Sequence, residues 1–295
     1  MGFLFIFMVG ILRIFQANIN KTTSSYMTGT QRYLRYGAYF EGAASLFSLV
    51  YLCVTGFYGF NIATVVCSAL TGICFLTELM TALTAMRGAP LVLCNFCSLG
   101  GGIILPSIAG IFFFGEPMSV FQWLGVAIFF VAVYFLSSTE KTAKKKLDVK
   151  TCVMLILNFV VNGFCSILGK YFAVRVENGN AALYSALTYA LASVFFLIAI
   201  MILPSVKQTK TADGYLPKKL YPYGLILGAV CATIVFSTTT LSRTVPVVIL
   251  NTVPSAISII GCLFVGRLLF SEKITVKNVF GVVFGVISAT LIVTA

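Results

Sequence analysis

Four charged residues interrupt long apolar stretches of this 295-residue chain, and they are the first candidates for chemistry. Glu41 lies in the segment YGAYFEGAASLF and Glu78 in the segment GICFLTELMTAL, while Arg13 and Lys170 lie in two other apolar runs. A charge at membrane depth is costly, so it marks a substrate pathway, a proton relay or an ion pair. Each glutamate therefore has two interpretations. It binds a substrate or a proton, or it forms a structural ion pair, for which Arg13 and Arg35 are available to Glu41. A further alternative for Glu41 is a position at the membrane interface. The alternative for Lys170 is that its amine reaches the membrane surface and serves no site.

Five uncharged polar residues inside apolar runs are further candidates for substrate binding. Asn158 and Asn162 are four residues apart, so they share one face of a helix. Asn95 and Asn251 each lie five residues after a proline. Amides at membrane depth either contact a substrate or join helices by hydrogen bonds. Tyr184 either lines a cavity or belongs to the aromatic belt at the membrane surface.

The residue types that enzymes and metal sites need are scarce. The chain has no histidine and only eight acidic residues, which leaves no Ser–His pair and no His-Glu-x-x-His helix. Cys94 and Cys97 have the spacing of a metal-ligand pair, but no second pair lies near them in the sequence. The segment LGGGIILP lacks the Lys-Ser/Thr of a phosphate loop, and its small residues favour close helix packing. We predict no metal, no cofactor and no enzymatic activity.

The composition of the chain identifies the environment of these residues. It is 59% hydrophobic and 9% charged, with a mean hydropathy of +1.03, whereas a soluble domain carries about 25% charged residues. Apolar runs of roughly 20 residues, enough to cross a bilayer as a helix, follow one another along the chain. We predict an all-α, multi-pass protein of the cell membrane, with the lipid bilayer as its surroundings. The net charge of +12 does not indicate nucleic-acid binding, because Lys and Arg gather in short connections.

Ten transmembrane helices are predicted from the apolar runs and the polar residues between them. They cover residues 2–20, 33–55, 59–84, 89–114, 119–138, 150–172, 180–204, 221–242, 245–270 and 275–294. The N-terminal run lacks the basic start and the small-residue cleavage site of a signal peptide, so it counts as the first helix. Two connections, residues 138–150 and 204–222, are long and polar, and the first separates five helices from five.

The two groups of five helices are related by an internal repeat with an offset of 156 residues. Polar and small residues match across this offset without a gap, as in the pairs Arg87 and Arg243, Pro90 and Pro246, Asn95 and Asn251, Glu116 and Glu272, and Ser119 and Thr275. We therefore predict two repeats, residues 1–138 and 149–295. Because each repeat has an odd number of helices, the second enters the bilayer from the opposite side, which makes the repeats inverted.

Glu116 and Glu272 are predicted to cap helices. Each lies in a turn just before a helix N-terminus, where unpaired N–H groups and the helix dipole stabilise a carboxylate. Ser119 and Thr275, three residues further on, are expected to share the capping. Direct contact of the two glutamates with substrate is the alternative.

The two copies of this turn resemble the EamA-like branch of the drug/metabolite transporter superfamily. They read FFFGEPMSVFQWLGVAIFFVAVYFL from Phe112 and LLFSEKITVKNVFGVVFGVISATLIV from Leu268. Each has an apolar helix, a Glu, a Ser or Thr three residues later, and a helix that contains Gly. The resemblance implies ten helices in two five-helix repeats and a secondary transporter of metabolites, amino acids, drugs or nucleotide sugars.

We expect a secondary transporter that moves a small metabolite, amino acid or drug-like solute by alternating access, with proton coupling through Glu41 or Glu78 as one mechanism. A nucleotide-sugar carrier of an endomembrane and a non-transporting membrane scaffold are the alternatives. The distribution of Lys and Arg places both termini outside the cell, whereas the resembled family has them inside. A monomer or a homodimer is expected.

Overall fold

The computed structural model describes residues 2–109, 119–137, 148–203, 216–241 and 247–294, and these residues form ten α-helices and no strand. The helices are α1 (Gly2–Ser24), α2 (Thr30–Thr55), α3 (Ile62–Gly88), α4 (Leu91–Ala109), α5 (Val120–Ser137), α6 (Val149–Arg175), α7 (Ala181–Ile202), α8 (Leu220–Leu241), α9 (Val247–Phe270) and α10 (Val276–Thr294). The prediction of an all-helical chain with ten helices is therefore confirmed. Seven of them, α2, α3, α4, α6, α7, α8 and α9, are long and apolar enough to cross a membrane.

Helix ends follow from side chains that accept hydrogen bonds from unpaired backbone N–H groups. Ser119 and Gln122 bond to each other's backbone N–H groups at the start of α5, at 3.2 and 2.9 Å. Thr275 accepts from the N–H of Asn278 at 3.2 Å at the start of α10. The expected capping by Ser119 and Thr275 is confirmed. Glu116 lies outside the described residues.

Glu272 caps a different helix from the one that we expected. Its carboxylate accepts hydrogen bonds from the N–H of Leu91, at the start of α4, through both oxygens at 3.0 and 3.1 Å. The carboxylate therefore stabilises the N-terminus of α4 rather than that of α10, which follows it in the chain. The reason is a tight turn after α9, described below, that directs the side chain towards α4.

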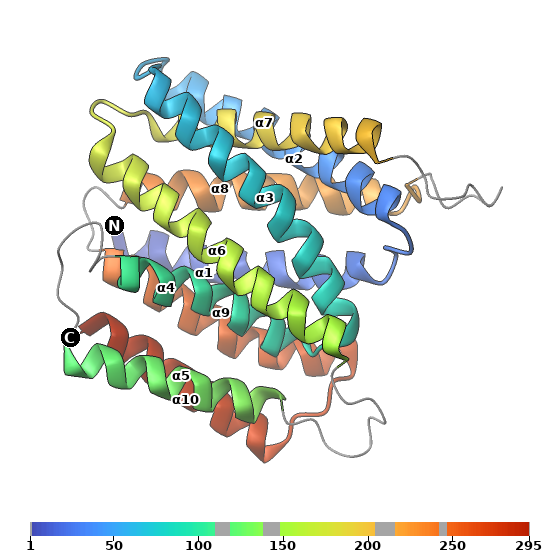
Figure 1. Cartoon of the computed structure of the whole chain (residues 1–295), viewed down its shortest axis with the longest axis vertical. Coiled ribbons are helices and arrows are strands. Elements are labelled where there is room, and N and C mark those ends of the chain that lie inside the picture. The colour runs from blue at the N-terminus through green and yellow to red at the C-terminus, as the bar shows by residue number, and fades with distance from the viewer. Residues whose placement is uncertain (1, 110–118, 138–147, 204–215, 242–246, 295) are drawn as a thin grey trace.

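Helices from the two ends of the chain pack in pairs (Figure 1). The pair α2 and α7 lies at one edge of the molecule, and the pair α5 and α10 lies at the opposite edge. Between them, α1 packs against α8 and α9, while α6 packs against α3 and α4. Helix α4 also packs on α9. Every helix of residues 2–137 thus has its main partner among residues 148–294.

Glycines permit the closest of these approaches. A Cβ at Gly101, on α4, would overlap the backbone carbonyl oxygen of Phe159 on α6. A Cβ at Gly100 would overlap the ring of Phe129 on α5. The segment LGGGIILP therefore acts in helix packing, as its small residues predicted.

Large apolar side chains also cover the outside of the helices. Leu46, Val54, Ile62, Leu157 and Leu268 are between 41% and 83% exposed on four different helices. A water-soluble protein rarely exposes so much contiguous apolar surface. Together with the seven long apolar helices, this exterior indicates a protein embedded in a membrane.

Candidate functional site

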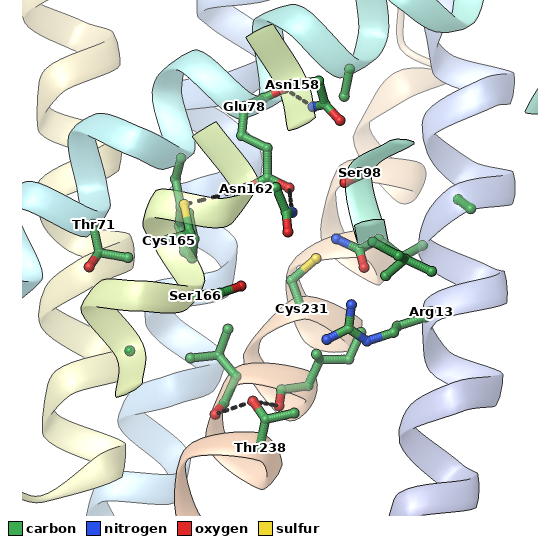
Figure 2. Close-up of a pocket in the computed structure, with 18 of the residues that line it drawn as sticks. Arg13, Thr71, Glu78, Ser98, Asn158, Asn162, Cys165, Ser166, Cys231 and Thr238 are labelled. Atoms are coloured by element: carbon green, nitrogen blue, oxygen red, sulfur yellow. Dashed lines mark hydrogen bonds between the residues drawn. The ribbon is translucent and has the colours of Figure 1, made fainter. Parts of the chain in front are cut away.

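A cavity of about 240 Å³ lies between α1, α3, α4, α6, α7 and α8 (Figure 2). Its wall contains an unusual number of polar side chains for the interior of an apolar protein. They include Arg13, Gln16 and Asn20 of α1, Thr71 and Glu78 of α3, Asn95 and Ser98 of α4, Asn158, Asn162, Cys165, Ser166 and Lys170 of α6, Tyr184 and Tyr189 of α7, and Thr238 and Thr239 of α8. Six of the eight residues that we expected to bind substrate or ion are therefore in one place: Arg13, Glu78, Asn95, Asn158, Asn162 and Tyr184.

The carboxylate of Glu78 is held by side chains of α6. Asn162 donates from Nδ2 to Oε1 at 2.9 Å, and Cys165 donates from Sγ to Oε2 at 3.8 Å. One turn before, Asn158 donates to the backbone oxygen of Glu78 and to Thr81 Oγ1, each at 3.3 Å. The predicted shared face of Asn158 and Asn162 is confirmed, and this face positions the carboxylate inside the cavity.

Arg13 reaches into the cavity from the middle of α1 (Figure 2). Its Nε atom is buried and has no hydrogen-bond partner, and its guanidinium forms no ion pair within the described part of the chain. Arg13 and Glu78 interact electrostatically across the cavity without direct contact. A cation and an anion therefore face the same space separately, and each has capacity for a further partner.

Asn95 joins two helices at the wall of the cavity. Its Nδ2 donates to Ser258 Oγ at 2.9 Å, which connects α4 to α9. Asn95 therefore forms an interhelical hydrogen bond, which is one of the two roles that the sequence predicted for such amides. Asn251 lies in α9, and its side chain is outside the part that the structure describes.

Tyr184 lies in the cavity wall and not in an aromatic belt. Its ring is 2% exposed and stacks on Phe172 with 4.2 Å between centroids. Its hydroxyl hydrogen-bonds with Thr71 Oγ1 at 2.8 Å. Tyr184 thus fixes α7 to α3 on the side of the cavity that faces away from α1.

Glu41 is separate from the cavity. It is 1% exposed on α2 and does not line the cavity, although it lies within electrostatic range of Glu78. Its Oε2 has no hydrogen-bond partner, and it forms no ion pair with Arg13 or Arg35 among the described residues. The alternative of an ion pair for Glu41 is therefore wrong among the described residues, and the side chain is enclosed by α2 and its neighbours. The alternative of an interfacial position stays a prediction.

Sequence reasoning missed several residues of the cavity. Ser166 follows Asn158 and Asn162 at the same four-residue interval, so helical periodicity could have found it. Ser98 and Thr238 carry no such signal, since single hydroxyl groups are common in apolar helices. Cys94 lines the cavity, and it and Cys97 are buried; no three potential ligands gather into a metal site within the described ranges.

Comparisons with known proteins identify a fold class and no function. No family model matches the chain, and no curated protein matches it. Twenty-eight chains of solved structures match. One of them, titled "Crystal structure of protein", superposes with a TM-score of 0.65 at 13% sequence identity, over 97% of this chain and 96% of its own. The chain therefore has the fold of a helical protein whose structure is known, and that title states no activity.

Proposed function

We propose that the protein is a secondary transporter that moves a small metabolite or amino acid across a membrane by alternating access. The observation that carries this proposal is the polar cavity inside an apolar helical bundle, with Arg13 and Glu78 facing it separately. A charged pair with no direct contact, enclosed by membrane helices, is suited to a solute that binds and leaves. Such a carrier needs no ATP site and no cofactor.

The pattern of helix packing supports two related five-helix repeats, residues 1–138 and 149–295. If each helix is exchanged with the one five positions later, the contacts of α1 with α8 and α9 become those of α6 with α3 and α4. The contacts α2–α7, α4–α9 and α5–α10 map onto themselves. The matched caps of α5 and α10 fit the same relation. Ten membrane crossings in inverted repeats, as in the EamA-like transporters that the sequence resembles, would place the cavity between the repeats.

The size of the cavity favours a small solute over a nucleotide sugar. Its volume of about 240 Å³ lies below the roughly 300–1,000 Å³ of pockets that hold drug-sized ligands. This space suits a molecule of the size of an amino acid. Arg13 would bind a carboxylate or another anionic group, while Glu78 would bind a cationic group or a proton.

A scaffold without transport is the second candidate, although the cavity gives it no support. An enzymatic role is not proposed, because the chain has no histidine for a Ser–His pair and the cavity lining holds a single carboxylate, Glu78. The cell membrane remains the proposed location, and the distribution of Lys and Arg favours termini outside.

A ligand screen followed by transport tests this proposal. Purified protein is screened by thermal stabilisation against small carboxylates, amines and amino acids, and the solute that stabilises it is then measured for uptake into proteoliposomes. Arg13→Gln should abolish uptake of an anionic or zwitterionic solute. Arg267→Gln is the matched control, because this arginine is exposed on α9 and lies away from the cavity. Equal solute movement in protein-free liposomes, or full uptake by Arg13→Gln, would contradict the proposal.

A further inference from the structure

Lys21 and Glu272 connect three helix ends at one side of the molecule. The Lys21 Nζ, in the last turn of α1, donates to the carbonyl oxygens of Met86 at 2.8 Å and Ala89 at 2.7 Å, at the end of α3. The same Nζ lies 3.3 Å from Glu272 Oε1. Glu272 in turn accepts from the Leu91 N–H at the start of α4. One ion pair therefore joins α1, the α3–α4 connection and the segment after α9.

The chain around Glu272 is built to direct its carboxylate. Ser271 has a φ of 53°, a left-handed conformation that is uncommon outside glycine. The N–H of Glu272 donates to the carbonyl oxygen of Gly266 at 3.0 Å, which closes the turn. A Cβ at Gly266 would lie 2.7 Å from Glu272 Oε2, so this glycine leaves the space that the carboxylate occupies.

The ion pair lies at one end of the cavity. Asn20, next to Lys21, and Met86, which accepts its hydrogen bond, both line the cavity wall. Cys94, one turn after Leu91, lines it as well and is only 3% exposed. At the opposite end the wall includes Val174, which is 59% exposed, close to the end of α6. The cavity therefore widens to the surface away from the ion pair and closes beside it.

We propose that Lys21 and Glu272 form a latch that closes one end of the cavity, and that its release opens this end. Each charge has two kinds of partner, the opposite charge and a helix end. The ammonium binds the carbonyls at the end of α3, and the carboxylate binds the N–H at the start of α4. Separation of α1 from the α3–α4 connection must break both bonds of Lys21 to the carbonyls, and it must also break either the ion pair or the bonds of Glu272 to Leu91. The side chains are 17% and 23% exposed, so water can solvate the charges once they part. The inference goes beyond the proposed function, because it concerns access to the cavity and is tested without a substrate.

Cys94 is a native reporter for the latch. Purified parent protein, Lys21→Gln, Glu272→Gln and Gly266→Ala are treated with a hydrophilic maleimide, and the modification of each cysteine is followed by peptide mass spectrometry. Loss of the latch should raise the labelling rate of Cys94 about tenfold or more, the population change that loss of one hydrogen bond to a charged group brings. Gly266→Ala keeps both charges but displaces the carboxylate, so it should act in the same direction.

Two controls keep the test decisive. Lys277→Gln removes an exposed lysine close to Glu272 in the sequence and should leave Cys94 as slow as in the parent. Cys67 is 5% exposed and lies outside the cavity lining, so it should stay unreactive in every variant. The latch is refuted if Cys94 keeps the parent rate in variants that remain monodisperse with a cooperative thermal transition. It is also refuted if Cys94 and Cys67 become reactive together, because this result indicates general loosening.

Discussion

Gly102→Ala should weaken solute binding through the carboxylate of Glu78, without direct contact between the new methyl group and Glu78. A Cβ at this position of α4 would lie 2.8 Å from Asn162 Oδ1 and 2.9 Å from Ser166 Oγ. An ordinary contact begins near 3.4 Å, so the Asn162 amide must move by about 0.6 Å, the difference between 3.4 and 2.8 Å. The same amide donates to Glu78 at 2.9 Å, and such a displacement stretches or breaks this bond.

The expected magnitude follows from the kind of hydrogen bond that is lost. A hydrogen bond to a charged group contributes about 1.5–3 kcal/mol, which corresponds to about 10- to 150-fold in a dissociation constant. Isothermal titration with the solute found by thermal stabilisation measures this loss. Gly169→Ala is the matched control, because Gly169 also lines the cavity and a Cβ there meets nothing within 4 Å. Parent affinity in Gly102→Ala would show that Asn162 does not set the position of the Glu78 carboxylate for binding.

Exchange of the latch charges, with Lys21→Glu combined with Glu272→Lys, should not restore the low labelling rate, because each charge then opposes its own helix end; restoration would identify a simple ion pair. Glu78→Gln should remove the dependence of uptake on pH, whereas Glu41→Gln, outside the cavity, should retain it. Uptake measured at several pH values decides this, and an unchanged profile in Glu78→Gln argues against proton coupling there. Gly101→Ala should destabilise the protein by about 3 kcal/mol, because its Cβ overlaps the backbone of α6. A thermal unfolding midpoint equal to that of the control variant Gly169→Ala would contradict this close approach.

Local patterns in the sequence predicted much of the helical framework. Apolar run lengths and polar connections yielded ten helices because a membrane helix has a nearly constant length. The four-residue spacing of Asn158 and Asn162 predicted their common face because helical geometry is local. Capping by Ser119 and Thr275 was predictable for the same reason.

Contacts between distant segments could not be read from the sequence. Arg13, Glu78 and Glu41 are all charged residues in apolar runs, so their sequence patterns are alike. Only helix packing shows that Arg13 and Glu78 face the cavity and that Glu41 does not. Glu272 illustrates the same limit. Its sequence context indicates a cap for the helix that follows, yet the turn at Ser271 carries its carboxylate to α4, which begins 181 residues earlier.

The interleaved pairing of helices has a consequence for biosynthesis. The partner that holds the Glu78 carboxylate, Asn162, is made 84 residues later. At a translation rate of ~5–20 residues per second, α3 waits about 4–17 seconds for this partner. During this interval a nascent chain carries Glu78 into the bilayer without the amide that later satisfies it. Protonation, water or the insertion machinery must shelter the carboxyl group until α6 is released from the ribosome.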